Sequence, residues 1–227
     1  MIKMVVFDMA GTTVDEDNLV YKTVTQAINE AGYPVDLNVV LDLGAGKEKH
    51  TAIKDVLKAH LGEKYRDEIS DQIFQSFKSK LKNAYLSAPV KPQKGAEHVF
   101  QILHNNNCRV VLNTGYSQST AHQLMKRLGW MNHPYIDLLV TASDVVNGRP
   151  NPDMIHLAMK NMQISDPKTV AKIGDSAIDI EEGQRAGCGL SIGITTGAQN
   201  EAQLLLAKPS AVIHELEAIL PIVESFT

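Results

Sequence analysis

Apolar residues follow two alternating patterns along most of the chain, and together these patterns predict an α/β fold. Short continuous apolar runs are typical of strands buried on both faces of a parallel sheet. Such runs lie at 4–7, 109–113, 137–141, 169–173 and 189–194. Apolar residues at helical spacing lie at 95–105, 117–128, 152–162 and 177–186, and a further helix, strand and helix follow residue 194. The alternation predicts a doubly wound parallel sheet with helices on both faces.

The stretch between the first two strands has only helical periodicity, without a strand pattern from Asp15 to Tyr85. Its four predicted helices begin after a cap at Asp17 or Asn18, at Pro34 to Asp36, at Lys47 after the break Gly44-Ala45-Gly46, and at about Tyr65. Two prolines in residues 87–92 predict a linker back to the sheet. We therefore expect a core domain of residues 1–15 and 87–227, with residues 16–86 forming a helical cap domain over the strand tips.

Composition limits the partners of the protein. Its 227 residues carry a net charge of −4, which argues against nucleic acid or an anionic membrane as the partner and favours a small molecule. The eight histidines show no zinc-type spacing, and the two cysteines are expected to be buried reduced thiols. No leader pattern and no run of about 18 apolar residues occurs, so a cytoplasmic location is expected.

Three of the predicted strands end in groups suited to catalysis. Asp8 ends the first, Thr114 and Gly115 end the second, and Asp175 follows the fourth, with Asp179 four residues on. Ligands of open α/β sheets bind beyond the carboxyl ends of the strands. A strand-end acid facing water, or a simple turn at Gly174-Asp175, is the structural alternative for each acid.

These groups occur in the order of a known set of motifs. Asp8-x-x-Gly11-Thr12, Thr114-Gly115, Arg149-Pro150 and Gly174-Asp175-x-x-x-Asp179 together resemble the haloacid dehalogenase superfamily of phosphotransfer hydrolases. The resemblance extends over the whole chain. It implies the α/β core described above, with the helical cap inserted directly after the first motif.

The resemblance also implies a role for each acid. Asp8 would be the nucleophile that attacks phosphorus, with Mg²⁺ to neutralise the phosphate charge. Asp8, Asp175 and the backbone carbonyl of Ala10 would bind the ion, and Asp179 would either bind it too or orient Asp175.

Phosphate contacts are implied for the remaining motif residues. The Thr114 hydroxyl would donate to a phosphoryl oxygen beside the backbone N–H groups of Gly115 and Met9, with Tyr116 also at the substrate. Thr114 to Ser117 could equally cap the following helix. Arg149 stands where most of the superfamily has lysine and would bind the phosphate, unless it is a solvated surface arginine.

Ala10 departs from most phosphatases of this superfamily, which carry there a second aspartate as general acid. General acid catalysis contributes roughly 10²- to 10⁴-fold in rate, and alanine cannot donate a proton. The phosphonatase branch has alanine at this position. Residues 8–15, Thr114-Gly115-Tyr116 and Gly148-Arg149-Pro150 all match that branch.

In the phosphonatase branch a cap lysine forms a Schiff base with the substrate aldehyde, so that the C–P bond breaks to an enamine. Gly44-x-x-Lys47-x-x-His50 falls in register with that segment and assigns the lysine role to Lys47. A position at a helix start and near Lys49 lowers the pKa of an amine. A plain electrostatic substrate contact is the alternative for Lys47, and His50 is either a proton shuttle or a surface residue.

The resemblance thus implies a Mg²⁺-dependent hydrolase that cleaves phosphonoacetaldehyde or a related phosphonate through an aspartyl-phosphate. A phosphomonoesterase of the phosphoglycolate-phosphatase type remains an alternative, as does an inactive phosphate-binding homologue. A receiver domain is disfavoured, because its phospho-accepting aspartate lies on a later strand and it lacks a large helical insertion. By resemblance alone, cap contacts make a homodimer plausible.

Overall fold

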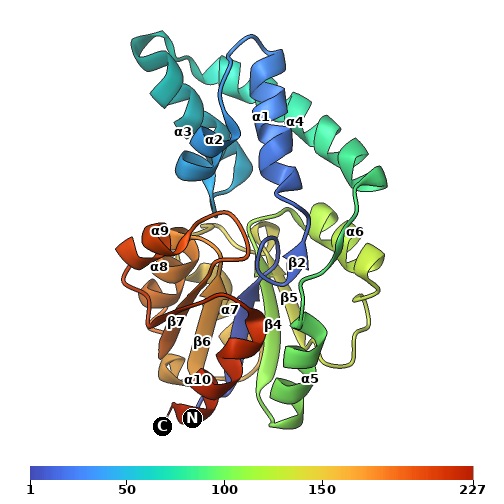
Figure 1. Cartoon of the computed structure of the whole chain (residues 1–227), viewed down its shortest axis with the longest axis vertical. Helices are drawn as coiled ribbons and strands as arrows, with labels where there is room; N and C mark the ends of the chain where they lie inside the picture. The colour runs from blue at the N-terminus through green and yellow to red at the C-terminus, as the bar shows by residue number, and fades with distance from the viewer. Residues whose placement is uncertain (227) are drawn as a thin grey trace.

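The computed structural model describes residues 1–226, with all of their side chains except those of residues 86 and 87. At its centre is a parallel sheet of six strands in the order β5-β4-β1-β6-β7-β8 (Figure 1). The strands are β1 (Met4–Asp8), β4 (Arg109–Thr114), β5 (Leu138–Thr141), β6 (Val170–Gly174), β7 (Leu190–Ile194) and β8 (Ala211–Ile213). The chain winds outward from β1 in both directions, which confirms the predicted doubly wound sheet.

Alternate residues of β1 pack into opposite layers, because successive strand side chains point to opposite faces. Val5 and Phe7 share an apolar cluster with residues of α5, α6 and α10, whereas Met4 and Val6 share another with residues of α7. The helices around the sheet are α5 (Ala96–Asn105), α6 (Gln118–Leu128), α7 (Asp153–Asn161), α8 (Ala177–Arg185), α9 (Glu201–Leu206) and α10 (Ile219–Ser225). Short 3₁₀ turns lie at Ala142–Asp144, Pro167–Thr169 and Leu216–Ala218. With both faces covered, β1 is buried throughout.

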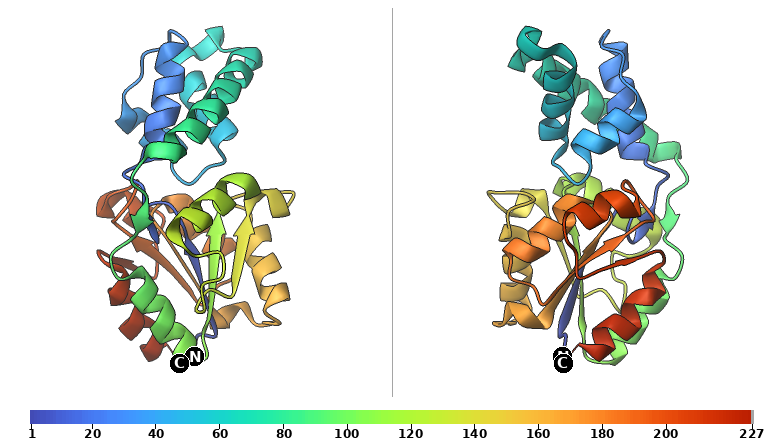
Figure 2. Two further views of the ribbon diagram at one scale, coloured as in Figure 1. Left: turned by 90° about the vertical axis from the view of Figure 1, so that its right-hand side faces the viewer. Right: turned by 60° about the vertical axis from the view of Figure 1, so that its left-hand side comes forward.

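Four helices between β1 and β4 lie together beyond the carboxyl ends of the strands (Figures 1 and 2). They are α1 (Leu19–Glu30), α2 (Leu37–Gly44), α3 (Lys49–Leu61) and α4 (Asp67–Ser87), with a 3₁₀ turn at Gly62–Lys64. We call them the helical block. Ile73, Phe77 and Leu81 form the buried stripe of α4 that its four-residue spacing predicts. The chain enters the block through β2 (Val14–Asp15) and leaves it through β3 (Lys91–Pro92), and these two strands pair antiparallel.

Three local predictions were wrong. Neither Asp17 nor Asn18 caps α1 with its side chain, because both have positive φ and no cap hydrogen bond is made. The predicted linker at 87–92 is partly structured: α4 reaches Ser87, and Lys91–Pro92 forms β3. The third helix begins at Lys49 rather than Lys47, with Glu48 accepting the cap hydrogen bond from Thr51 N at 3.0 Å. Lys47 therefore precedes the helix and lies outside its first turn.

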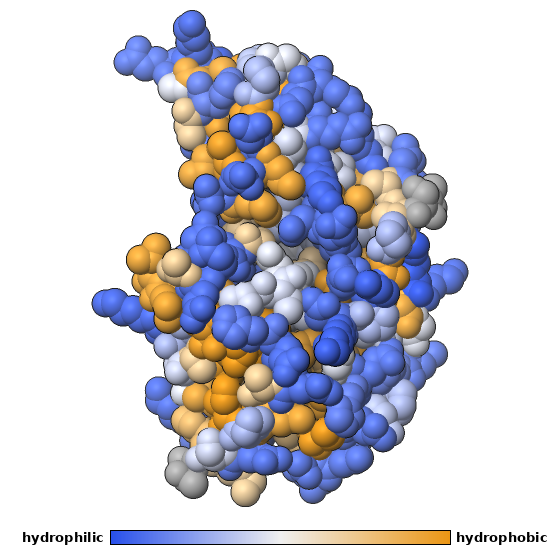
Figure 3. Space-filling model, viewed as in Figure 1, coloured by the Kyte–Doolittle hydropathy of each residue, from blue (hydrophilic) through white to orange (hydrophobic). Residues whose placement is uncertain are grey.

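Other features follow the composition. Cys108 and Cys188 are free and buried, as expected. Within residues 1–226, none of the helices combines the length and apolar character needed to span a membrane. Figure 3 shows polar residues mainly on the right of this face and apolar residues mainly toward its left, including a group where α9 lies, and Leu206 of that helix is 82% exposed.

Candidate functional site

The site forms where β1, β4 and β6 end side by side. The strand register sets Asp8 opposite Asn113 and pairs the end of β1 with β6, after which Asp175 follows. Asp8, Thr114 and Asp175 face a small cavity of about 20 Å³ that the helical block closes from above with Tyr21 and Lys49. We call it the Asp8 cavity. The three motifs predicted to converge therefore do so.

The turn after β1 holds Asp8 in place. The Thr13 hydroxyl donates to the Asp8 carbonyl at 2.8 Å, and the backbone N–H of Val14 donates to the Met9 carbonyl at 2.7 Å. Gly11 has φ +81°, and a Cβ there would collide with the Asp175 carboxylate. A glycine is thus required both by the backbone conformation and by the close approach of Asp175.

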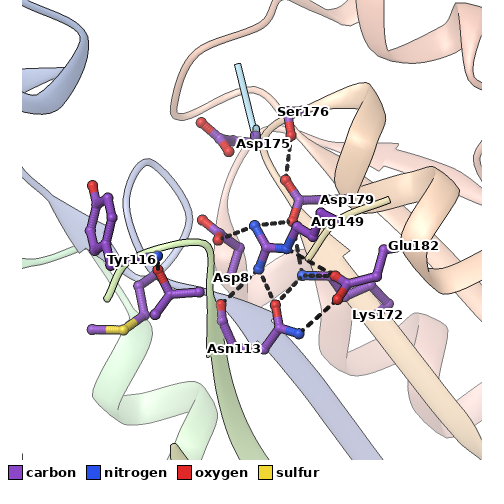
Figure 4. A network of polar contacts seen from close by, with 12 residues as sticks. Asp8, Asn113, Tyr116, Arg149, Lys172, Asp175, Ser176, Asp179 and Glu182 are labelled. Carbon is purple, nitrogen blue, oxygen red and sulfur yellow. Dashed lines mark hydrogen bonds and ion pairs between the residues drawn. The ribbon is translucent and has the colours of Figure 1, made fainter. Parts of the chain in front are cut away.

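Arg149 is buried and uses all of its donors on the protein (Figure 4). Its Nη1 lies 2.6 Å from Asp8 Oδ1 and 2.8 Å from Asp179 Oδ1, and its Nε donates to Glu182 Oε2 at 3.0 Å. Its Nη2 donates to the carbonyl and the side-chain oxygen of Asn113. The guanidinium therefore orients the acids, although it also lines the Asp8 cavity where a phosphate contact was predicted.

Lys172 is a second buried cation in the same network. Its ammonium lies 2.9 Å from Asp179 Oδ1 and 3.5 Å from Glu182 Oε2, and it is fully buried in the middle of β6. Our sequence analysis missed both Lys172 and Glu182. The signals were a lysine within an apolar strand and an acid one helical turn after Asp179, both of which are rare in a core without a partner.

The carboxylates of Asp8, Asp175 and Asp179 gather closely enough to hold a metal ion, with one oxygen from each lying within 4.8 Å of the others. Burial raises the pKa of Asp8 even with Arg149 beside it. Burial and the charges of Asp8 and Asp179 raise the pKa of Asp175 much further. Carboxylates this close together repel one another when they are ionised, and a cation bound between them removes the repulsion. An all-oxygen donor set suits a hard divalent cation.

Asp179 differs from the other two acids. Burial alone would raise its pKa, but the charges of Arg149 and Lys172, together with the Ser176 hydroxyl at 2.5 Å from its Oδ2, hold the pKa below its ordinary value. Asp179 is thus ionised, with its Oδ1 ion-paired with Arg149 and Lys172 and its Oδ2 hydrogen-bonded to Ser176. Its contacts suit a carboxylate that fixes the neighbouring groups better than one free to bind an ion.

The residues predicted to contact phosphate divide into two groups. Thr114, Gly115 and Tyr116 line the Asp8 cavity, and Thr114 Oγ1 accepts from Tyr116 N at 3.2 Å. The Met9 side chain is instead buried in the apolar core, so that only its backbone is available to the site. Ala10 lines the cavity and offers only a methyl group and its backbone there.

Of the residues at 47–50, the structure brings Lys49 to the Asp8 cavity and not the predicted pair. Lys47 Nζ lies 2.6 Å from Asp55 in the helical block. His50 stacks on Phe74 at 4.7 Å between ring centroids, and its Nε2 lies 2.7 Å from Asp71. Lys49 is 8% exposed, donates to the Lys47 carbonyl at 2.7 Å, and lies 3.4 Å from the Tyr21 hydroxyl. Burial lowers its pKa, although Asp8 and Glu16 act against this.

A buried carboxylate joins the helical block to the core beside this lysine. Glu16, just after β2, accepts from the Tyr85 hydroxyl at 2.5 Å and from the Tyr116 hydroxyl at 3.0 Å. Tyr85 lies near the end of α4, and Tyr116 lies in the loop after β4. Arg127 of α6 also donates to the carbonyls of Tyr85 and Ala88. The two segments that connect the helical block to the core, one at Glu16 and one after Tyr85, are therefore both held to the core at the same place.

Comparison with known proteins places this geometry in context. The model of the haloacid dehalogenase-like hydrolase family matches residues 2–187. The phosphonoacetaldehyde hydrolase of Latilactobacillus sakei subsp. sakei is 34% identical over 204 residues, which cover 85% of this chain and 75% of that protein.

Two further comparisons match almost the whole chain. A phosphorylated carbohydrates phosphatase of Thermotoga maritima is 22% identical over 228 residues, covering 96% of this chain and all 100% of its own. The crystal structure of a phosphonoacetaldehyde hydrolase-like protein from Oleispira antarctica superposes with a TM-score of 0.86 at 20% identity, covering 99% of this chain and 92% of that one.

Proposed function

Because the chain belongs to the haloacid dehalogenase-like hydrolase family, we propose that it cleaves the C–P bond of phosphonoacetaldehyde or a related phosphonate through an aspartyl-phosphate on Asp8. The observation that carries the proposal is the pairing of Ala10 with a buried lysine, Lys49, across the Asp8 cavity. The identity to a phosphonoacetaldehyde hydrolase supports it. In this proposal residues 16–86, which hold nearly all of the helical block, are the cap domain, and residues 1–15 and 87–227 are the core.

Ala10 argues for a carbon leaving group. An alkoxide leaving from a phosphate ester needs a proton, and the methyl group of Ala10 supplies none. A carbon leaving group needs instead a place for the electron pair of the broken bond. An imine beside that carbon supplies one.

Lys49 suits the imine better than Lys47 does. A nucleophilic amine must lose its proton, and the burial that lowers the pKa of Lys49 favours this. Lys47 instead forms an ion pair with Asp55 at 2.6 Å and does not line the Asp8 cavity. We therefore propose Lys49 as the imine-forming residue, and Lys47 stays a prediction that the experiment below also tests.

The reaction balances in three stages. The Lys49 amine condenses with the substrate carbonyl and releases one water. The Asp8 carboxylate then attacks phosphorus, and the C–P electron pair passes into the imine to give an enamine. Water hydrolyses the aspartyl-phosphate, and the enamine takes up a proton at carbon before a further water releases the aldehyde and the free amine. The net change is the addition of one water to the phosphonate.

Asp8, Asp175 and the carbonyl of Ala10 would hold Mg²⁺, with Asp179 fixing the cluster from behind. The donor set fits the ion: among the described residues Arg149 and Lys172 pair with Asp8, Asp179 and Glu182, whereas the buried Asp175 carboxylate has no cationic partner and accepts only from the backbone N–H of Ala198. When bound, Mg²⁺ would neutralise charge on the phosphoryl oxygens. Thr114 and the backbone of Gly115 would donate to the same oxygens.

Borohydride trapping tests the proposal. Adding borohydride together with phosphonoacetaldehyde should inactivate the protein irreversibly and leave a two-carbon mass increment on a single lysine. Fragmentation of the peptide that contains residues 47–50 would distinguish Lys49 from Lys47. Cleavage of the phosphonate without any trapped adduct would remove the imine from the mechanism.

Hydrolysis of a phosphate ester is the second candidate. The match to a phosphorylated carbohydrates phosphatase over nearly the full length of both proteins favours it. Lys49 would then act as an ammonium that stabilises the leaving oxygen. A screen of phosphonoacetaldehyde beside common phosphate esters, each with Mg²⁺, would separate the two reactions.

A further inference from the structure

A second cavity, of about 220 Å³, adjoins the Asp8 cavity between the helical block and the core. Its walls come from the start of α3, from α4, and from the start of α6, which lies across the strand tips below the block (Figure 2). Lys49, Gly115 and Tyr116 line both cavities. We call this second cavity the lysine cleft.

The two cavities differ in size, and this difference indicates which part of the substrate each would hold. The Asp8 cavity, at about 20 Å³, has room for little more than one water-sized group, which a phosphoryl group would fill. The lysine cleft has about ten times that volume. Lys49 stands at their border, so a carbonyl carbon bound to its Nζ would have its phosphonate arm in one cavity and any other substituent in the other.

The inner wall of the lysine cleft is apolar. Phe74, Phe77 and Leu81 of α4 line it, and Phe77 and Leu81 are buried. His50 stacks on Phe74, which fixes the orientation of that ring. An apolar wall of this kind is suited to a hydrocarbon chain.

The rim of the cleft is positively charged. Lys78 and Lys82 line it, and Lys78 Nζ lies 4.9 Å from the centroid of the Phe74 ring. Four other lysines of the block are paired with acids, in Lys22–Asp17, Lys47–Asp55, Lys54–Asp67 and Lys80–Glu30. No carboxylate of the described residues pairs with Lys78 or Lys82. Glu48, the one acid among the described lining residues, caps α3.

We propose that the lysine cleft binds the organic part of the substrate, and that this part is an apolar chain ending in a carboxylate. The inference rests on the proposed function for the reacting end. It names the substrate class as 2-oxoalkylphosphonates whose carbonyl carbon carries such a chain. Phosphonoacetaldehyde, with only hydrogen at that position, would leave the cleft unused.

Binding of two unreactive phosphonates tests the cleft independently of the reaction. With Mg²⁺ present, calorimetry should find that 5-carboxypentylphosphonate binds roughly tenfold more tightly than hexylphosphonate, as expected for two exposed ion pairs. The double variant Lys78→Glu, Lys82→Glu should lose this preference. Lys64→Glu, an exposed lysine of the block outside the cleft, should keep it. Equal affinity for the two ligands, or an equal loss in Lys64→Glu, would overturn the inference.

Turnover separates this inference from the proposed function. We expect kcat/KM for 5-carboxy-2-oxopentylphosphonate to exceed that for 2-oxohexylphosphonate, with the preference lost in the double variant. If no oxoalkylphosphonate is cleaved but the carboxylate preference in binding remains, the proposed reaction fails and the cleft stands. If phosphonoacetaldehyde is cleaved and the binding preference is absent, only the cleft fails.

Discussion

The two sides of the Asp8 cavity differ in how firmly their charges are held. On the core side, every donor of Arg149 has an acceptor, and Lys172 lies between Asp179 and Glu182. On the side of the helical block, Lys49 has a tyrosine hydroxyl and a backbone carbonyl as partners and no carboxylate of the described residues. One side holds fixed charges, and the other carries a group that can exchange its proton.

This difference matches the two tasks of the proposed reaction. Attack on phosphorus gains from charges that are already in place and need no reorganisation. Imine formation requires an amine that is neutral at one step, and a lysine locked in an ion pair would resist this. The firmly held side should therefore tolerate substitution least.

The largest effect on turnover is expected on the core side of the Asp8 cavity. Asp8→Asn should lower turnover by roughly 10⁴-fold or more, because an amide is not a nucleophile. Phosphate release measures the loss, and circular dichroism checks that the fold is intact. A variant that keeps more than a trace of activity would show that Asp8 does not carry the reaction.

The two lysines provide the next test. Lys49→Arg keeps the charge but cannot form an imine, so cleavage of phosphonoacetaldehyde should fall by roughly 10³-fold. Lys47→Arg preserves the contact with Asp55 and should stay within about threefold of the parent protein. The reverse order of effects would return the imine to Lys47, as the sequence register predicts.

A smaller effect is expected from supplying the missing acid. Ala10→Asp adds a carboxylate beside Asp8 and Asp175, which should lower phosphonate cleavage by roughly tenfold through repulsion. If the protein hydrolyses phosphate esters instead, the same change should raise that rate by roughly tenfold or more. Assaying both substrates on one preparation decides between the two reactions.

The smallest effect concerns pH. The imine requires neutral Lys49, so kcat/KM should rise as pH passes upward through the lowered pKa of this residue. The charge of Glu16 raises that pKa. Glu16→Gln should therefore move the rising limb to lower pH, by roughly 0.5 unit. Tyr85→Phe removes a hydrogen bond but no charge and should leave the limb in place; an equal shift in both variants would rule out this explanation.

The positions of the site residues on the core side of the Asp8 cavity were predictable, because they follow from where the strands end. The apolar runs that became β1, β4 and β6 end at Asp8, Thr114 and Gly174, and a parallel register brings such ends together whatever the helices do. Arg149 was found through its motif. The sequence did not predict that every N–H of Arg149 would donate to a protein group. These contacts depend on the tertiary positions of Glu182 and Lys172, which no local sequence pattern indicates.

The side of the helical block was less predictable for a related reason. Residues 45–48 form a turn between two helices, and a turn gives no periodicity from which to decide whether Lys47 or Lys49 points inward. The start of α3 at Lys49 and the bond from Gly46 N to the Tyr21 hydroxyl at 2.9 Å decide the matter. Tyr21 is 25 residues away in the sequence, so the sequence pattern offered no signal for this contact.

The position of Glu16 bears on how substrate enters. Any motion that lifts the helical block has to part Tyr85 from Tyr116 at this carboxylate and admit water to it. Hydrogen bonds to a charged group contribute about 1.5–3 kcal/mol each, and a free-energy gap of a few kcal/mol leaves a minor conformation at about 0.1–10% of the population. We therefore expect a brief, sparsely populated open form, so that substrate capture depends on how often these two tyrosines separate, while the attack of Asp8 on phosphorus proceeds in the closed form.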